Sequence, residues 1–180
     1  MLELQEKLDD LYSSGDYQTI ESIVLDAIEQ TDEKCFNFAA LYNELAGLYK
    51  ITGRYAESEA AYLKSVEAFE QGDFESVSEY VTVLINLVGL YRIMGEFKNA
   101  LSTFSNALSI MHRYFGETEE LAIGMMDLSE VYELLGDLPS SSELLKKGIQ
   151  IMKNIHGSEY PALQSAVSKL EQMELVQNDN

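Results

Sequence analysis

The sequence predicts an all-α fold, built as a stack of four helix hairpins and closed by one further helix at the C-terminal end. Three observations predict it: a motif that recurs about every 42 residues, apolar residues spaced as on one face of a helix, and a glycine between the two halves of each copy. With 46% apolar and 24% charged residues among 180, the composition is that of a globular domain or a short array of repeats.

Three copies of the motif align without a gap around Gly53, Gly95 and Gly136. They read YNELAGLYKITGRYAESEAAY, LINLVGLYRIMGEFKNALSTF and MMDLSEVYELLGDLPSSSELL. Each copy has a leucine eight residues before the glycine, a tyrosine four before it, and small residues five and twelve after it. Chance rarely keeps so many positions in register three times, so the chain is an array of repeats.

Each copy predicts two antiparallel helices, because its apolar residues fall on one helical face both before and after the glycine. In the second copy they are Leu84, Leu87, Val88 and Tyr91, then Ala100, Phe104, Ala107 and Leu108. A glycine between the helices fits the left-handed residue that ends a helix. In the third copy, Pro139 falls in a first turn, where proline is tolerated, whereas Gly148 weakens its helix by about 1 kcal/mol relative to alanine.

A weaker copy lies at the front around Gly15, with Lys7 in place of the expected leucine. Behind the array, residues 158–176 predict one extra helix with a polar outer face, which an open stack needs at its end. We therefore expect a single array over residues 1–176 and a frayed polar tail at 177–180. Its predicted parts are repeats at 1–34, 35–76, 77–117 and 118–157 and a capping helix at 158–176.

This pattern resembles the tetratricopeptide repeat (TPR), whose usual period is about 34 residues. The longer period here resembles the subclass found in kinesin light chains, and LINLVGLYRIMGEFKNALSTFSNALSI is a close match to it. The resemblance implies a right-handed α–α superhelix, the TPR solenoid. In that fold the first helix of each repeat lines a concave groove, and the second helix forms the convex back.

The resemblance also implies which residues face the groove. They are Ala40, Asn43, Glu44, Gly47 and Lys50 in the first strong copy, Thr82, Ile85, Asn86, Gly89 and Arg92 in the second, and Ile123, Met126, Asp127, Glu130 and Glu133 in the third. The weaker front copy adds Leu2, Gln5, Glu6, Asp9 and Tyr12. Groove asparagines of the family often hydrogen-bond the main chain of a bound peptide, and Asn43 and Asn86 offer the same donors and acceptors.

Gly47 and Gly89 lie in the middle of predicted first helices, where glycine costs about 1 kcal/mol relative to alanine. Three explanations are open for them. A ligand backbone approaches the helix at these residues, a neighbouring helix packs closely there, or the substitution is neutral.

The chain carries 12 basic and 31 acidic residues, a formal net charge of −19. Nucleic-acid phosphates and anionic membranes repel such a chain, so we expect neither as a partner. Carboxylates along the groove favour a peptide with apolar anchors and basic flanks. These carboxylates are Glu44, Asp127, Glu130 and Glu133.

The sequence offers no chemistry of a cofactor, a metal or a catalyst. Neither a GxxxxGK[ST] nor a GxGxxG motif occurs, and no cofactor is expected. His112, His156 and Cys35 lack metal-ligand spacing, so no metal site is expected. The ETEE run at 117–120 is typical of acids in a first helical turn. We therefore expect no enzyme.

The expected function is a non-catalytic module that binds a peptide or protein segment in the groove, as an adaptor, scaffold or co-chaperone. Two alternatives are open: self-association, for example as a homodimer, and regulatory sensing of a small signalling peptide. Cys35 is the single cysteine and cannot form an internal disulfide, and the start MLELQEKLDD lacks the order of a signal peptide. Both observations favour a cytoplasmic location.

Overall fold

The computed structural model describes residues 2–33, 35–72 and 76–178, and every regular element in these ranges is helical. The side chains of residues 2, 3, 5, 177 and 178 lie outside the description, and so do the predicted groove residues Leu2 and Gln5 and the predicted tail at 177–180, apart from the helical backbone that reaches Asn178. The elements are α1 (Leu2–Ser14), α2 (Tyr17–Glu29), α3 (Phe36–Ile51), α4 (Tyr55–Gln71), α5 (Val77–Met94), α6 (Phe97–Phe115), α7 (Glu119–Leu134), α8 (Leu138–His156), the 3₁₀ turn η1 (Pro161–Leu163) and α9 (Gln164–Asn178). The all-α prediction is confirmed.

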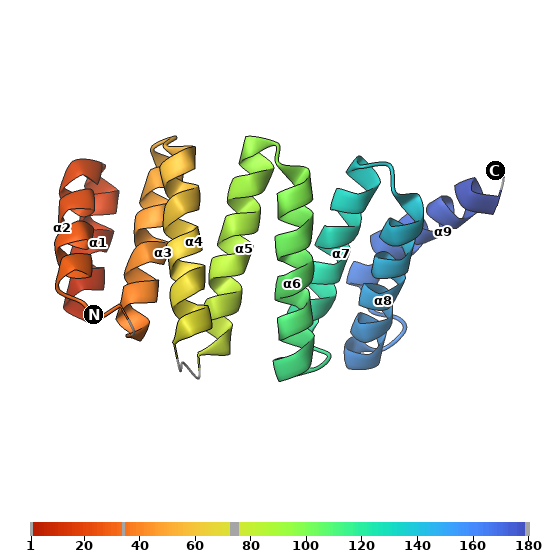
Figure 1. Cartoon of the computed structure of the whole chain (residues 1–180). Coiled ribbons are helices and arrows are strands. Elements are labelled where there is room, and N and C mark those ends of the chain that lie inside the picture. The colour runs from red at the N-terminus through yellow and green to blue at the C-terminus, as the bar shows by residue number, and fades with distance from the viewer. Residues whose placement is uncertain (1, 34, 73–75, 179–180) are drawn as a thin grey trace. The chain divides into compact units, whose positions relative to one another are not determined.

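The chain forms two compact units, Met1–Glu96 and Phe97–Asn180. In unit 1, α1 and α2 form one hairpin, α3 and α4 form the next, and α5 packs against both helices of that second hairpin (Figure 1). The helices pack through apolar stripes. On α2, for example, Ile20, Val24 and Ile28 recur every fourth residue and are buried against the following hairpin.

In unit 2, α6 packs against α7, α7 and α8 form a hairpin, and α9 packs on α8 (Figure 1). Thr118 caps α7 by accepting a hydrogen bond from the backbone N–H of Leu121 at 3.2 Å. Glu119 and Glu120 lie in the first turn of α7, as predicted for the ETEE run. Pro139 lies in the first turn of α8, where the N–H that proline lacks would have no helical partner.

Left-handed glycines end the first helices of the hairpins, as predicted. Their φ angles are +74° at Gly15, +76° at Gly53, +74° at Gly95 and +79° at Gly136. The residue after the glycine directly precedes the second helix. Asp16 and Asp137 cap that helix there, accepting hydrogen bonds from the N–H groups of Thr19 and Ser140, whereas Arg54 makes no such cap.

Gly148 has a role beyond the weakening predicted for its helix. It is buried where α8 meets α7, and a Cβ atom on it would lie 2.8 Å from the carbonyl oxygen of Ala122 and 3.0 Å from Cγ of Met126. Cβ atoms do not approach other heavy atoms so closely without a shift of the neighbours. The glycine therefore permits a close approach of the two helices.

The helix α5 is 18 residues long with a mean hydropathy of 1.3, enough by length and composition to cross a membrane. Core helices of globular proteins meet the same criterion. In unit 1 the apolar residues of α5 are used for packing, since seven of them are buried. They are Val81, Val83, Leu84, Leu87, Val88, Leu90 and Tyr91.

Candidate functional site

Ten of the predicted groove residues lie on α3 and α5 of unit 1, two helices in contact with each other. Leaving Ala40 aside, we call the other nine the first-helix face: Asn43, Glu44, Gly47 and Lys50 of α3 with Thr82, Ile85, Asn86, Gly89 and Arg92 of α5. Spacings of three and four residues place the members on one side of each helix. Every one of them is half-buried or exposed, while the stripes behind them are buried.

The two asparagines of this face bond to each other across the gap between α3 and α5. Nδ2 of Asn86 donates to Oδ1 of Asn43 at 3.1 Å. The bond uses one donor of one amide and one acceptor of the other. In the described ranges no protein partner is found for the nitrogen of Asn43 or the oxygen of Asn86. The pair therefore still offers both a donor and an acceptor, the combination that a peptide unit needs.

Gly47 and Gly89 lie over open space. A Cβ atom built on either residue meets no heavy atom of the described chain within 4 Å outside its own helix backbone. Close packing of a neighbouring helix, one of the three explanations offered by the sequence, is therefore excluded within unit 1. Each glycine leaves a shallow place on the first-helix face where another main chain could come near.

The charged residues of the first-helix face differ in how many contacts they make with neighbouring side chains. The hydroxyl of Tyr12 on α1 donates to Oε1 of Glu44 at 2.7 Å, and burial together with this bond raises the pKa of Tyr12 above its usual range. Lys50 is half-buried with its Nζ 5.7 Å from the ring centroid of Tyr62, and burial lowers its pKa. Arg92 is exposed and forms no ion pair with the described residues.

Of the other predicted residues that the structure describes, Glu6, Asp9 and Tyr12 lie on α1 of unit 1, and five lie on α7 in unit 2, where two of the five are ion-paired. Nζ of Lys169, on α9, lies 2.8 Å from Oε2 of Glu133 and 3.6 Å from Oε1 of Glu130. Asp127 is exposed. Met126 is half-buried, with its side chain against α8 at Gly148. Lys169 of the C-terminal helix α9 thus offsets part of the negative charge that the sequence predicts along the groove.

Sequence reasoning missed a set of buried hydroxyls. Three of the repeated small positions are serines that bond to the facing helix, a role that the repeat pattern did not predict. Ser58 donates to the carbonyl oxygen of Ala46, Ser65 to that of Ala39, and Ser141 to that of Ser129, each at 2.7 Å. Serine in place of alanine at a buried position was the available signal, because a buried hydroxyl requires a partner.

Metal-binding geometry is not found in the described part of the chain, where no three His, Cys, Asp or Glu side chains gather closely enough to hold an ion. His156 lies 3.0 Å from Oε2 of Glu119 and stacks on Tyr160, with ring centroids 4.4 Å apart. The contact with Glu119 joins the end of α8 to the start of α7, and the stacking joins it to the segment before η1. The unit 1 geometry instead suits contact with a main chain.

Known proteins carry the same repeats. Sequence models described as tetratricopeptide repeat match residues 39–71 and 79–154. Two Arabidopsis thaliana proteins named KINESIN LIGHT CHAIN-RELATED 2 and 1 are 28% identical over 151 residues and 25% identical over 163 residues. These alignments cover 82% and 88% of this chain but 23% and 26% of the relatives. The chain thus spans about a quarter of the length of these curated relatives.

Solved structures show the same fold at low sequence identity. A putative kinesin light chain with nearly identical TPR-like repeats from Podosopora anserina has a TM-score of 0.77 at 16% identity, covering 98% of this chain and 88% of that one. BtubC (BKLC) from P. vanneervenii has a TM-score of 0.72 at 17% identity, covering 96% and 78%. The apo form of RapI has a TM-score of 0.71 at 18% identity, covering 96% and 62%.

These matches confirm the predicted fold class, an all-α superhelix of the TPR type. The repeats of about 42 residues find their counterparts among kinesin light chain-like sequences and structures. The chain therefore belongs to the tetratricopeptide repeat family, with repeats of the kinesin light chain type, a family of protein–protein interaction modules that are typically non-catalytic.

Proposed function

We propose that this chain binds a peptide or protein segment along the first-helix face, as an adaptor, scaffold or co-chaperone. The observation that carries the proposal is the pairing of two open mid-helix glycines with two asparagines that retain a donor and an acceptor. An extended main chain needs both features, close access to the helix surface and polar groups that satisfy its N–H and C=O groups.

Side chains around the asparagines supply the rest of a recognition surface. Ile85 is 38% exposed between Thr82 and Asn86 and offers an apolar anchor point. Glu44 is held in place by Tyr12 and presents a carboxylate on the same face. We expect a ligand with apolar anchors and basic flanks, which Glu44 and the acidic surroundings attract.

To test this proposal, peptides that bind the chain are selected from a display library of random 12-residue peptides. The selected peptides are then synthesised, and their affinity for the protein is measured by titration. The double variant Asn86→Ala/Arg92→Glu removes one amide and reverses one charge on the face. We expect it to weaken binding about tenfold or more, because hydrogen bonds from a ligand main chain and a charge contact are lost together. Undiminished affinity for every selected peptide would show that the first-helix face is not the site.

Gly89→Ala separates binding from stability. Alanine meets no neighbour at this position and is the better helix former, so the variant should unfold at a higher temperature than the wild type. The added methyl group should nevertheless obstruct a ligand main chain and weaken binding. The matched control is Ser102→Ala on the exposed side of α6, where affinity should stay constant. Gly89→Ala with unchanged affinity would argue that no main chain passes there.

A further inference from the structure

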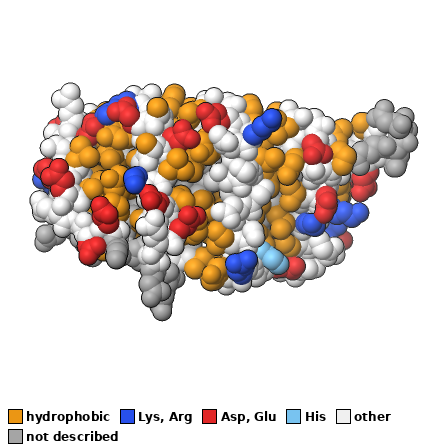
Figure 2. Space-filling view, in the orientation of Figure 1, with side chains coloured by type: hydrophobic (Ala, Val, Ile, Leu, Met, Phe, Trp, Pro, Cys, Tyr) orange, Lys and Arg blue, Asp and Glu red, His pale blue; other side chains and the backbone are white. Residues whose placement is uncertain are grey.

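Unit 2 contains an open groove on the side of its second helices. It is a cavity of about 360 Å³ between α6 and α8, with α7 beneath. Met125, Leu144 and the ring of Tyr132 are half-buried and line its floor, while His112, Glu143 and Lys147 are exposed at its rim. Figure 2 shows the hydrophobic surface between α6 and α8 with charged groups at its margins.

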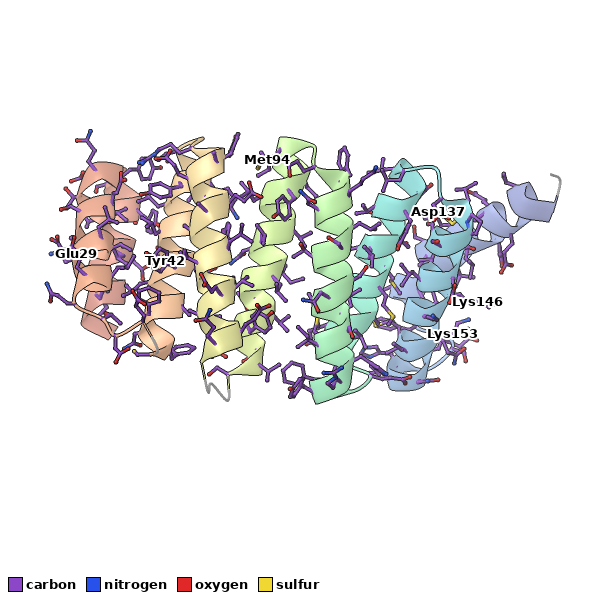
Figure 3. The ribbon with its side chains drawn as sticks, in the orientation of Figure 1. Glu29, Tyr42, Met94, Asp137, Lys146 and Lys153 are labelled. Carbon is purple, nitrogen blue, oxygen red and sulfur yellow. The ribbon has the colours of Figure 1, made fainter. Side chains whose placement is uncertain are left out.

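The charges of unit 2 are segregated around this groove. On α7 the groove is lined by Met125, Leu128 and Tyr132, which follow at spacings of three and four residues and so share one side of the helix. Asp127, Glu130 and Glu133 lie on a different side of α7. The two helices that form the walls carry a basic excess, with Glu143 as their single acid. Their bases are Lys98, Arg113, Lys146, Lys147 and Lys153, of which Lys146 and Lys153 are seen along α8 in Figure 3.

This local excess outweighs the net charge of −19 at contact distance. At physiological ionic strength the Debye length is about 8 Å, so charges beyond the walls are largely screened from a ligand in the groove. Nζ of Lys147 lies 2.7 Å from Oε1 of Glu143, so these two wall charges offset each other, and Nζ of Lys146 lies 3.7 Å from Oε1 of Glu174 on α9. An incoming carboxylate therefore meets walls on which bases outnumber acids, and no ion pair is found for Lys98, Arg113 or Lys153 among the described residues.

A repeat-by-repeat comparison explains why the groove is open. In unit 1, Arg54 reaches over the ring of Tyr49, with Cζ 4.1 Å from the ring centroid, and bonds to Glu21 on α2 at 2.7 Å. Counted from the glycine of each repeat, the position of Arg54 is held by Asp137 in unit 2 and that of Tyr49 by Tyr132. Asp137 turns back to cap α8 at Ser140 (Figure 3). Among the described residues, no guanidinium contact with the ring of Tyr132 is found to match the one on Tyr49.

We propose that the groove between α6 and α8 is a second docking site, which takes a peptide segment with apolar side chains flanked by aspartate or glutamate. The apolar side chains enter over Met125, Leu144 and Tyr132, and the carboxylates lie against His112, Lys147 and their basic neighbours. The rim is exposed along both walls, which suits anchor side chains of a longer segment. The site differs from the first-helix face in its helices, its unit and the charge it selects.

The experiment uses the full chain with the first-helix face disabled by Asn86→Ala/Arg92→Glu. A random 12-residue display library is selected on this protein and counter-selected on the same protein with Ser109→Trp. Ser109 is exposed at the groove, so the indole fills the groove without entering the core. Circular dichroism checks that both baits are equally helical. We expect the retained peptides to place Asp or Glu beside Leu, Ile, Met or Phe.

The consensus peptide is then synthesised with a fluorophore and titrated. Lys147→Glu should weaken its binding about tenfold, whereas Lys64→Glu should leave it unchanged. Lys64 is the matched control, because it is an exposed α4 lysine paired with Glu67 at 2.9 Å, much as Lys147 is paired on α8. Replacing the apolar residues of the peptide by serine should also abolish binding.

Several results would overturn the proposal. Retained peptides that are basic or uncharged would contradict the charge preference, and retention that is indifferent to Ser109→Trp would contradict the location. Equal binding of the serine-substituted peptide would reduce the groove to a simple charged patch. If no peptide is retained and sedimentation shows mass that rises with concentration and falls with Ser109→Trp, the occupant is a second copy of the chain.

Discussion

The helices α2 to α4 of unit 1 and α6 to α8 of unit 2 are built from the same motif, yet the second helices of the two units differ in surface charge. In unit 1, α2 and α4 carry seven acids and one base, and Arg54 ties them together through Glu21 and Glu57. In unit 2, α6 and α8 carry five bases and one acid, and a groove remains between them. The shared motif specifies the hairpin, while residues outside it decide what the surface can bind.

The largest effect should come from a position where the two units differ in their core. Ser65 of unit 1 corresponds to Gly148 of unit 2, where α8 comes closest to α7. Gly148→Ala should destabilise the protein by about 2 kcal/mol, because the clash with the Ala122 carbonyl exceeds the gain in helix propensity. Thermal and denaturant unfolding measure it.

Gly47→Ala is the control for that prediction. It makes the same change in the middle of a helix over open space, and it should stabilise the protein by about 1 kcal/mol. A stabilising Gly148→Ala would mean that α8 can move away from α7 at no cost, and the difference between the two hairpins would disappear.

The next effect should be equal in both units. Ser58 and Ser141 occupy the same repeat position, are both fully buried, and donate to a carbonyl of the facing helix at 2.7 Å. Replacing either by alanine should cost about 1 kcal/mol, the net worth of one hydrogen bond. Unequal losses, measured by chemical denaturation, would show that the two hairpins do not share this device.

The smallest effect depends on pH and belongs to unit 1. Hydrogen bonds from Arg54 lower the pKa of Glu21 and of Glu57 below the ordinary value of 4.5. The stability that these two carboxylates gain from Arg54 is fully present at pH values above 4.5. It is lost as the pH falls through their lowered pKa values, because the carboxylates become protonated. Arg54→Met should therefore destabilise the protein at pH 7 and show a shallower loss of stability in acid. Parallel pH profiles of wild type and variant, between pH 7 and pH 2, would contradict the assignment.

Much of the fold could be predicted from the sequence, because its determinants are local. The left-handed glycines, the apolar stripes and the acids of the ETEE run each act within one or two helical turns. The bond between Asn43 and Asn86 could not be predicted, since it depends on the distance between two helices. The same holds for Lys169 of α9, whose pairing with Glu130 and Glu133 of α7 depends on how α9 packs on α8.

The candidate sites, too, could be predicted only in part from the sequence. The resemblance to the family placed the members of the first-helix face on their helices, but their availability rests on contacts. Only the structure shows that a Cβ atom on Gly47 or Gly89 would meet nothing within 4 Å in the part of the chain that it describes, and that Tyr12 holds Glu44. The repeat motif carried no signal for the groove of unit 2, which lies in the unit where Asp137 takes the repeat position of Arg54.

The residue that follows each left-handed glycine therefore has an influence far larger than its size. Arg54 at this position forms an ion pair with Glu21 of the neighbouring hairpin. Asp137 at the same position accepts a hydrogen bond from the backbone of its own helix and makes no such contact with a neighbouring hairpin in the described part of the chain. Neither choice disturbs the interior. In repeat arrays of this kind, a single substitution at this position can thus open or cover a binding groove, while the fold stays the same.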